Sequence, residues 1–299
     1  MKIQNKIDFI KSVQQFNIKT EYAIIKPNWI NDQEGEFTEA EILGWLLEAL
    51  PEQKKIVVEG YTPWRGLIYQ PTSTNDELKI DLLGGKHYRN FYREMDRNFL
   101  HKTGIEDILH EFNAEYFNIT ECVWDGKCIS KDHILKEIEG RGYFFSNPEI
   151  ASYMPIRLYE IRQNATFVNF SKIKQEKHNP YINFSMTIKN MFGLIPDPSR
   201  AKYHGGENHY KGLDKALADI FFLYVLIFRK SLWIAEGIRT IAKEPFAPEK
   251  TIEKDLNYLF LGKDPIKVDS DACKPIQQNP NMSDYYRLIK QISITHKVF

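Results

Sequence analysis

Apolar and polar positions follow one another along the chain in blocks that predict strands and helices in turn. Residues 22–26 form a short apolar run that ends at Pro27, and residues 54–59 form a second run that ends at Gly60. Between them, residues 38–50 repeat apolar positions at helical spacing, with Thr38 and Glu41 as a capping-box pattern at the start. This order predicts a βαβ unit, in which a crossover helix joins two parallel strands.

The same alternation continues to the end of the chain. Further strands are expected at residues 114–120, 157–161, 165–173, 231–238 and 257–262, and a hairpin at 122–132 around Asp125-Gly126. Further helices are expected at residues 1–20, 96–112, 212–229, 283–292 and after Pro265. The pattern predicts an α/β fold with a mainly parallel sheet and helices on both faces. We expect a single domain over residues 1–299, with long loops at 60–95 and 120–150 as candidate insertions.

Composition and charge narrow the class of protein. Forty basic residues balance forty acidic ones, so no net field draws the chain to nucleic acid or to an anionic membrane. The most apolar run, residues 216–228, is too short to span a bilayer and contains Asp219. The amino-terminal stretch is polar, and the three cysteines form no CxxC pair, which favours a reducing compartment. We therefore expect a cytoplasmic protein that binds neither nucleic acid nor membrane.

Candidate chemistry is densest between residues 183 and 210. The donors in this stretch are Lys189, Asn190, Arg200, Lys202, Tyr203, His204 and His209. Loops that a rigid scaffold holds often carry functional groups, so this density predicts a ligand site. His204 is the first candidate for proton transfer, because an imidazole titrates near neutral pH.

A second group of candidates follows the first two predicted strands. Lys26 and Asn28 flank Pro27, and Glu59 ends the next strand at the same expected sheet edge. Ligands in open α/β sheets bind beyond the carboxyl ends of the strands. Glu59 is a candidate general base, a candidate metal ligand or an ion-pair partner of Lys26, and Arg65 offers a planar fork for a carboxylate or phosphate.

Two aspartates near the carboxyl end have different expected roles. Asp264 precedes Pro265 and is expected to cap the helix that this proline begins. Asp269 is expected to face inward, where a buried carboxylate would need a partner such as Lys26 or Lys189. The sequence contains no GxGxxG, no P-loop, no HExxH and no iron–sulfur spacing, so the cofactor stays undetermined.

Several of these segments together resemble the domain-of-unknown-function 362 family. The matching segments, in family order over roughly residues 21–275, are IIKPNW, VVEG, FVNFSKIK, TIKNMFGLIPDPSRAKYH, LWIAEGI and GKDPIKVDSDA. The resemblance implies an α/β fold and a site gathered around the Lys-Pro-Asn loop, a lysine-containing segment and the Lys-Asn-Gly turn. It implies no settled reaction. Many members carry a ferredoxin-like segment, which this sequence does not show.

The sequence departs from the family pattern at two places. The usual Asp-Gly after the late buried strand is Glu236-Gly237 here. The family's Lys-Thr-His signature is not cleanly present, and both Lys174 and the pair Lys177-His178 are candidates for the matching position. Lys172 lies in the same segment.

The leading hypothesis is an enzyme that acts on a small anionic metabolite by acid/base chemistry in a basic cleft at the strand ends. Its catalytic candidates are His204, Lys189, Glu59 and Asp269. Its ligand-binding candidates are Lys26, Asn28, Arg65, Lys174, Lys177, His178, Asn190, Arg200 and Tyr203. The alternatives are a redox accessory protein that works with a ferredoxin-like iron–sulfur partner, and a metal-dependent enzyme that uses Glu59, Asp269, His204 or His209.

Overall fold

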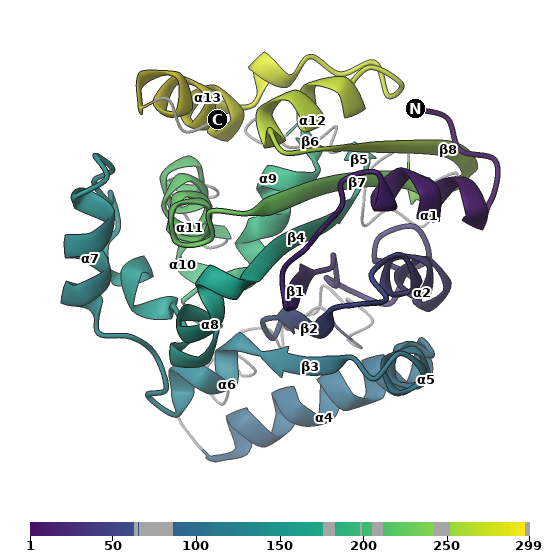
Figure 1. The fold of residues 1–299 in the computed structure, drawn as a ribbon. Helices are drawn as coiled ribbons and strands as arrows, with labels where there is room; N and C mark the ends of the chain where they lie inside the picture. Colours follow the sequence, from purple (N-terminus) through teal and green to yellow (C-terminus); the bar gives the residue numbers. More distant parts are fainter. Residues whose placement is uncertain are drawn as a thin grey trace, which may run out of the picture.

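A computed structural model of the chain describes residues 1–62, 65, 86–175, 183–197, 199–204, 212–241 and 252–296. Across these residues the main sheet has the strand order β3-β2-β1-β4-β7-β8 (Figure 1). Its strands are β1 (Tyr22–Lys26), β2 (Lys54–Glu59), β3 (Glu115–Asn118), β4 (Ala165–Lys172), β7 (Ser231–Ile241) and β8 (Ile252–Gly262). Neighbouring strands from β3 to β7 run parallel, and β8 pairs antiparallel with β7. The α/β prediction with a mainly parallel sheet is confirmed.

One face of the sheet is covered by helices from the first part of the chain. These are α1 (Lys6–Gln14), α2 (Ala40–Ala49) and α5 (Ile105–Glu111), joined by the carboxyl end of α4 (Lys86–Lys102). Ile25 and Val168 point into this layer, and Leu43 and Leu46 of α2 pack against them without exposure to solvent. The alternation of side chains along each strand explains why both faces of this central sheet are apolar.

The other face is covered by helices from the middle and the end of the chain. They are α6 (Ile119–Trp124), α7 (Lys131–Glu139), α8 (Ile156–Ile161), α9 (Thr187–Asn190), α11 (Leu213–Ile227), α12 (Pro265–Ala272) and α13 (Asp284–His296). Ile24 and Phe167 point into this layer, where Leu217 and Phe221 of α11 meet them. Shorter elements are β5 (Lys174–Gln175), β6 (Phe184–Ser185), α10 (Ala201–His204), η1 (Pro148–Tyr153), η2 (Arg162–Asn164), η3 (Met191–Leu194) and η4 (Pro280–Met282).

The direction of winding reverses between β1 and β4. From β1 the chain passes through α2 to β2, on one face, whereas from β4 it passes through α9 and α11 to β7, on the other face. The two strands are direct neighbours, with Lys26 opposite Asn169. Ligands in doubly wound sheets bind beyond the carboxyl ends of the strands at such a switch point. This edge is therefore the first place to look for a site.

Several local predictions are corrected. Residues 122–132 hold the end of α6 and the start of α7 instead of a hairpin, and residues 157–161 lie in α8 instead of a strand. The helix predicted at 96–112 is two helices, which Gly104 separates with φ of 70°. Residues 86–95, expected in a loop, begin α4. The capping box is wrong, because Glu39 is the N-cap of α2 and Thr38 Oγ1 accepts from the Asn28 amide.

Other local predictions are confirmed. The βαβ unit consists of β1, α2 and β2, and Asp264 caps α12 by accepting from the amides of Ile266 and Lys267. Residues 66–85 of the expected long loop lie outside the described ranges. No helix in the described part of the chain combines the length and the apolar character needed to cross a bilayer.

Candidate functional site

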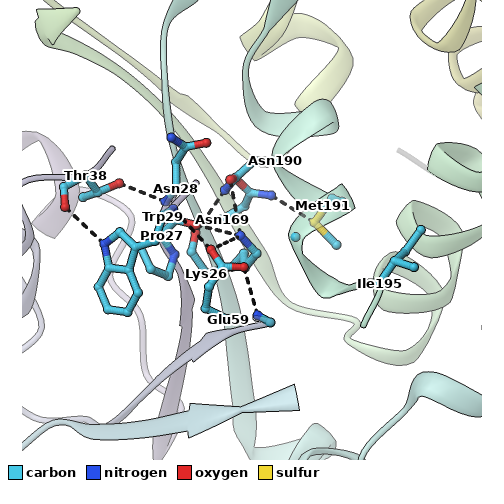
Figure 2. A network of polar contacts seen from close by, with 12 residues as sticks. Lys26, Pro27, Asn28, Trp29, Thr38, Glu59, Asn169, Asn190, Met191 and Ile195 are labelled. Atoms are coloured by element: carbon cyan, nitrogen blue, oxygen red, sulfur yellow. Dashed lines mark hydrogen bonds and ion pairs between the residues drawn. The ribbon is translucent and has the colours of Figure 1, made fainter. Parts of the chain in front are cut away.

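Lys26 lies at the centre of a polar cluster at the carboxyl end of β1 (Figure 2). Its side chain is 1% exposed, and its Nζ donates to Glu59 Oε2 at 2.8 Å, to the Pro27 carbonyl at 2.7 Å and to Asn190 Oδ1 at 3.3 Å. Pro27 ends the strand because its ring locks φ and it has no amide hydrogen. The chain then turns so that the carbonyl of Pro27 faces the ammonium group. The predicted Lys26–Glu59 ion pair is present.

Two asparagines connect this cluster to the next strand. Asn190 Nδ2 donates to the Lys26 carbonyl at 3.2 Å and to Asn169 Oδ1 at 3.0 Å. Asn169 Nδ2 in turn donates to the Thr187 carbonyl at 3.0 Å, and Met191 Sδ is also within 3.0 Å of it. A buried amide needs such partners, since each unsatisfied polar group costs about 1–3 kcal/mol. The short helix α9 is thereby fixed against the switch point.

Glu59 is held from several sides. The amides of Trp29 and Gly60 donate to its two carboxylate oxygens at 3.3 and 3.0 Å. Gly193 lies directly against the Lys26–Glu59 pair, because a Cβ there would be 2.4 Å from Glu59 Oε1 and 2.7 Å from Lys26 Nζ. Only glycine fits at this position without a shift of its neighbours. The turn that contains Lys189, Asn190 and Gly193, the Lys-Asn-Gly turn, is thus packed onto the ends of β1 and β2.

Arg65 joins three segments around the same cluster. Its Nε donates to the Trp29 carbonyl at 2.9 Å, one Nη donates to the Gly60 carbonyl at 2.8 Å, and the other Nη bonds to Asp96. Asp96 also accepts from Tyr116 of β3 at 2.8 Å. Every guanidinium nitrogen of Arg65 therefore meets a protein acceptor. The structure places this residue as a brace between strand-end loops, although the sequence indicated a fork for a ligand.

Burial makes Lys26 easier to deprotonate. Burial, the largest effect, lowers the pKa of Lys26 to about 8, although Glu59 raises it; Arg200 and Arg65 lower it further. An amine with a pKa near 8 exists in both protonation states close to neutral pH. This is the property that general acid–base catalysis requires.

A second buried lysine cluster lies at the same edge of the sheet but on its opposite face. Lys172 Nζ pairs with Glu39 Oε2 at 2.6 Å and with Glu236 Oε1 at 2.6 Å, and none of the three side chains is more than 9% exposed. Burial lowers the pKa of Lys172, but Glu236 and Glu39 outweigh it, so the pKa is raised. The Glu-Gly of β7 that replaces the family's Asp-Gly supplies one of these carboxylates. We call this group the Lys172 cluster and the first one the Lys26 cluster.

Lys174 contacts the segment that follows Pro27. Its Nζ is 3.2 Å from the Glu36 carbonyl and 3.5 Å from Asn28 Oδ1, and Asn28 Nδ2 donates to the same carbonyl at 2.6 Å. Asn28 and Lys174 therefore lie close together, as the family resemblance implied for the Lys-Pro-Asn loop and the lysine-containing segment. Lys177 and His178, the alternative for the family's lysine position, lie outside the described residues.

Two more cations lie over the Phe192 ring next to the turn that contains Lys189, Asn190 and Gly193. Lys189 Nζ is 5.1 Å from the centroid of the Phe192 ring, and Arg200 Cζ is 5.9 Å from it. Arg200 Nη2 also donates to the Gly193 carbonyl at 2.7 Å, an oxygen that accepts from the Gly60 amide as well. Lys189, Asn190 and Arg200 therefore flank the segment that covers Lys26. Cations near an aromatic ring are attracted by its quadrupole.

The remaining candidates are less central. Tyr203 donates to Glu149 at 2.9 Å, and burial raises its pKa. His204 ends α10, but its side chain lies outside the described part, as does all of His209. Asp269 is buried as predicted, but its carboxylate accepts from Thr187 and from the Ile188 amide, at 2.6 to 3.1 Å, instead of meeting the expected lysine. Burial raises the pKa of Asp269 to about 7, although these hydrogen bonds lower it.

Two residues of the site were not predicted. Asn169 is the one amide in the apolar strand ATFVNFSK, and a polar side chain in a fully buried strand indicates a specific partner. Asp197 is 4% exposed, and burial raises its pKa to about 6, although Arg200 and Arg65 lower it. Its place in the loop after Gly193 could have suggested it. Within the described ranges, no three His, Cys, Asp or Glu side chains are grouped to hold a metal ion.

Comparison with known proteins gives a family. Neither the curated proteins nor the solved structures contain a match to this chain. A family model described as Domain of unknown function (DUF362) matches residues 24–274 of the 299. The matched range includes the Lys26 cluster, the Lys172 cluster and the turn at Gly193. The chain therefore belongs to the DUF362 family.

Proposed function

We propose that this protein is an enzyme that binds a small anionic metabolite, with a carboxylate or a phosphate, at the carboxyl edge of β1 and β4 and moves a proton on it. The observation that carries the proposal is the Lys26–Glu59 pair, buried at the point where the strand order reverses. Structural ion pairs are more often exposed, and a buried pair at a switch point is a site candidate.

The Lys26 cluster supplies the acid and the base. Lys26, with a pKa lowered to about 8, can give up a proton near neutral pH, and Glu59 lies 2.8 Å away to receive or return it. Asn190 and the Pro27 carbonyl fix the amine in place, so the proton moves along a defined line. In this proposal, His204 remains a second candidate for proton transfer.

The cations of the neighbouring segments would hold the anion. Arg200 is half-buried, whereas Lys189 and Lys174 are 8% and 6% exposed, and all three follow the strand ends or the Gly193 turn. Asn28 adds an amide next to Lys174. Guanidinium and ammonium groups bind carboxylates and phosphates through charge-assisted hydrogen bonds. The presence of these cations supports an anionic ligand over a neutral one.

The experiment measures proton transfer without knowledge of the full reaction. The protein is incubated in D₂O with a panel of small carboxylic and phosphorylated metabolites, and NMR follows deuterium incorporation at carbon atoms next to a carbonyl or carboxylate. We expect exchange in at least one compound. The Lys26→Met/Glu59→Gln variant should lower its rate at least ~100-fold, because general acid–base groups contribute about 10²–10⁴-fold.

The same two strands provide a matched control at their other end. Lys54 Nζ pairs with Glu21 Oε1 at 2.8 Å, but the side chains are 67% and 47% exposed. The Lys54→Met/Glu21→Gln variant should keep full exchange, since exposed pairs contribute little. A Lys26→Met/Glu59→Gln protein that unfolds at the wild-type temperature and still exchanges at the wild-type rate would refute the proposal.

A further inference from the structure

We infer that Lys26 acts as a nucleophile, which forms an imine with the carbonyl carbon of a small 2-oxo acid bound at this edge. The inference rests on the proposed function, because it names the substrate class and the covalent step of the same site. Three features of the cluster carry it: the hydrogen-bond partners of the amine, the position of the Arg200 guanidinium, and Gly193, which both groups approach.

The partners of Lys26 leave its amine able to react. Glu59 is its carboxylate partner, and its other two acceptors are the uncharged oxygens of Pro27 and Asn190. Lys172 has two carboxylates at 2.6 Å, which keep it protonated and without a lone pair. A nucleophilic lysine is typically desolvated and close to other cations. Lys26 is 1% exposed, and the positive charges of Arg65 and Arg200 act on its amine. The lowered pKa of Lys26 agrees with this geometry.

The guanidinium of Arg200, whose Nε donates to the Ile195 carbonyl at 3.1 Å, lies one residue away from the amine. Arg200 Nη2 is 2.7 Å from the Gly193 carbonyl, and the missing Cβ of Gly193 would lie 2.7 Å from Lys26 Nζ. Amine and guanidinium therefore flank the same glycine. A 2-oxo acid carries its carbonyl carbon directly bonded to a carboxylate, so one such ligand can engage both groups. Phe192 is in contact with both Lys189 and Arg200, so a second cation lies at the same turn.

The covalent step needs no further reagent. Glu59 first takes a proton from the Lys26 ammonium, and the freed lone pair of Nζ attacks the carbonyl carbon. As the C=O π bond breaks, the oxygen takes that proton from Glu59 to give a carbinolamine. Glu59, 2.8 Å from Nζ, accepts a proton from nitrogen and returns it to the hydroxyl, so that water leaves as the C–O bond breaks. The resulting protonated imine withdraws electrons from the adjacent carbon and acidifies its C–H bond. Glu59 can then remove that proton, which is the transfer that the proposed function requires.

The test traps the imine in the full-length protein. The protein is incubated near pH 7.5 with glyoxylate, pyruvate, 2-oxobutyrate or 2-oxoglutarate, each with sodium cyanoborohydride, which reduces C=N to C–N. Intact mass should rise by the mass of the oxo acid less one oxygen atom, and peptide mapping should place the adduct on Lys26 before any other lysine. L-lactate, which has no carbonyl to attack, should give no adduct.

Variants and outcomes separate this inference from the proposed function. Lys26→Arg keeps a cation beside Glu59 but cannot form an imine, so its adduct should be lost while the fold is kept. Because mapping is done on the wild-type protein, the assignment holds even where a variant fails to fold. Labelling that maps to Lys172, Lys189, surface lysines or only the amino terminus, or no labelling with any of the four acids, would overturn the imine. Lys26-dependent deuterium exchange without an adduct would keep the proposed function and discard the imine alone.

Discussion

Lys26 and Lys172 are two equally buried lysines at the carboxyl ends of neighbouring parallel strands, and they differ in their charged neighbours. Each is 1% exposed, and each ends its strand. Lys26 has one carboxylate partner and two arginines nearby, whereas Lys172 has two carboxylates. The pKa of Lys26 is lowered to about 8 and that of Lys172 is raised. The balance of neighbouring charge, and not depth, decides which lysine can titrate.

The two clusters therefore have different roles. A lysine with two carboxylates is a permanent cation, and it joins α2 through Glu39 to β7 through Glu236. A buried lysine with one carboxylate and two cations nearby has a pKa of about 8 and can lose its proton near neutral pH. The first arrangement suits a structural connection between layers, and the second suits chemistry. This division of roles predicts several measurable differences, from the largest expected effect to the smallest.

Loss of one carboxylate should cost far more in the Lys26 cluster. Glu59→Gln leaves a buried ammonium beside Arg65 and Arg200, and removal of one partner of a buried pair costs about 3–5 kcal/mol. Glu236→Gln leaves Lys172 paired with Glu39 and removes an excess buried negative charge, so its cost should stay below about 1 kcal/mol. Urea denaturation at pH 7 measures both free energies of unfolding. Equal losses of unfolding free energy in the two variants would show that the number of carboxylate partners does not distinguish the two lysines.

The two clusters should respond to pH in opposite directions. The ordinary pKa of a lysine is 10.5 and that of Lys26 in the folded protein is about 8, so between these values the unfolded chain binds one proton more. Stability then rises with pH, by about 3 kcal/mol over the window from about pH 8 to about pH 10.5. The raised pKa of Lys172 means that its contribution is present below pH 10.5 and is lost only above it.

The measurement is a difference between proteins. Free energies of unfolding for wild type and Lys26→Met/Glu59→Gln are compared from about pH 7.5 to about pH 10, so that the other lysines and tyrosines cancel. Wild type should gain on the variant as pH rises. A constant difference across this range would mean that Lys26 stays protonated in the fold.

The glycine beside each cluster offers a smaller test. Gly193→Ala places a methyl group 2.4 Å from Glu59 Oε1, whereas Gly237→Ala places it 3.1 Å from Cδ1 of Ile173, the end of an apolar side chain. Overpacking costs about 1–3 kcal/mol, so Gly193→Ala should lie near the upper end and Gly237→Ala near the lower. Thermal unfolding ranks the two variants. A greater loss for Gly237→Ala would place the tighter contact at the Lys172 cluster.

The smallest expected effect concerns the hydrogen bonds that Asp269 accepts from α9, next to the Lys26 cluster. Among the described contacts, the Lys172 cluster has no corresponding helix support. Asp269→Asn keeps one oxygen for Thr187 but loses the acceptor for the Ile188 amide. We expect a loss of about 1 kcal/mol, the typical net value of one hydrogen bond. Stability should be read near pH 8, above the pKa of about 7, where the carboxylate is ionised. Wild-type stability together with weaker adduct formation would instead assign Asp269 to the reaction.

The fold was predictable where local signals agreed. Pro27, Pro51 and Gly60 bound the βαβ unit, and Asp264-Pro265 marks the start of α12, because proline and glycine fix backbone geometry regardless of distant contacts. Residues 157–161 misled, since five residues are too few to separate a strand from one turn of helix. Asp125-Gly126 was also ambiguous: Gly126, with φ of 67°, makes a turn that serves two helices as well as two strands.

The sequence predicted only those contacts of the site that follow from where the parallel strands end. Lys26 and Glu59 meet because β1 and β2 are parallel and end at one edge, which the βαβ pattern implies. Asn169 and the carboxylates of the Lys172 cluster could not be assigned, because Glu39 and Glu236 are nearly two hundred positions apart in sequence and meet only through the winding of the sheet. The partners of Arg65 could not be assigned for a similar reason, since two of its acceptors are backbone carbonyls that no sequence pattern shows and the third is the distant Asp96.

The carbonyl of Gly193 has a mechanical consequence. One oxygen accepts from the Gly60 amide and from Arg200, and Gly60 in turn is held by Arg65, which also grips the carbonyl of Trp29. The loops that follow β1 and β2 are thus connected to the turn at Gly193 through a short chain of hydrogen bonds. A molecule that displaced this carbonyl would leave the Gly60 amide with Glu59 Oε1 as its remaining acceptor, and it would release Arg200 Nη2 at the same time.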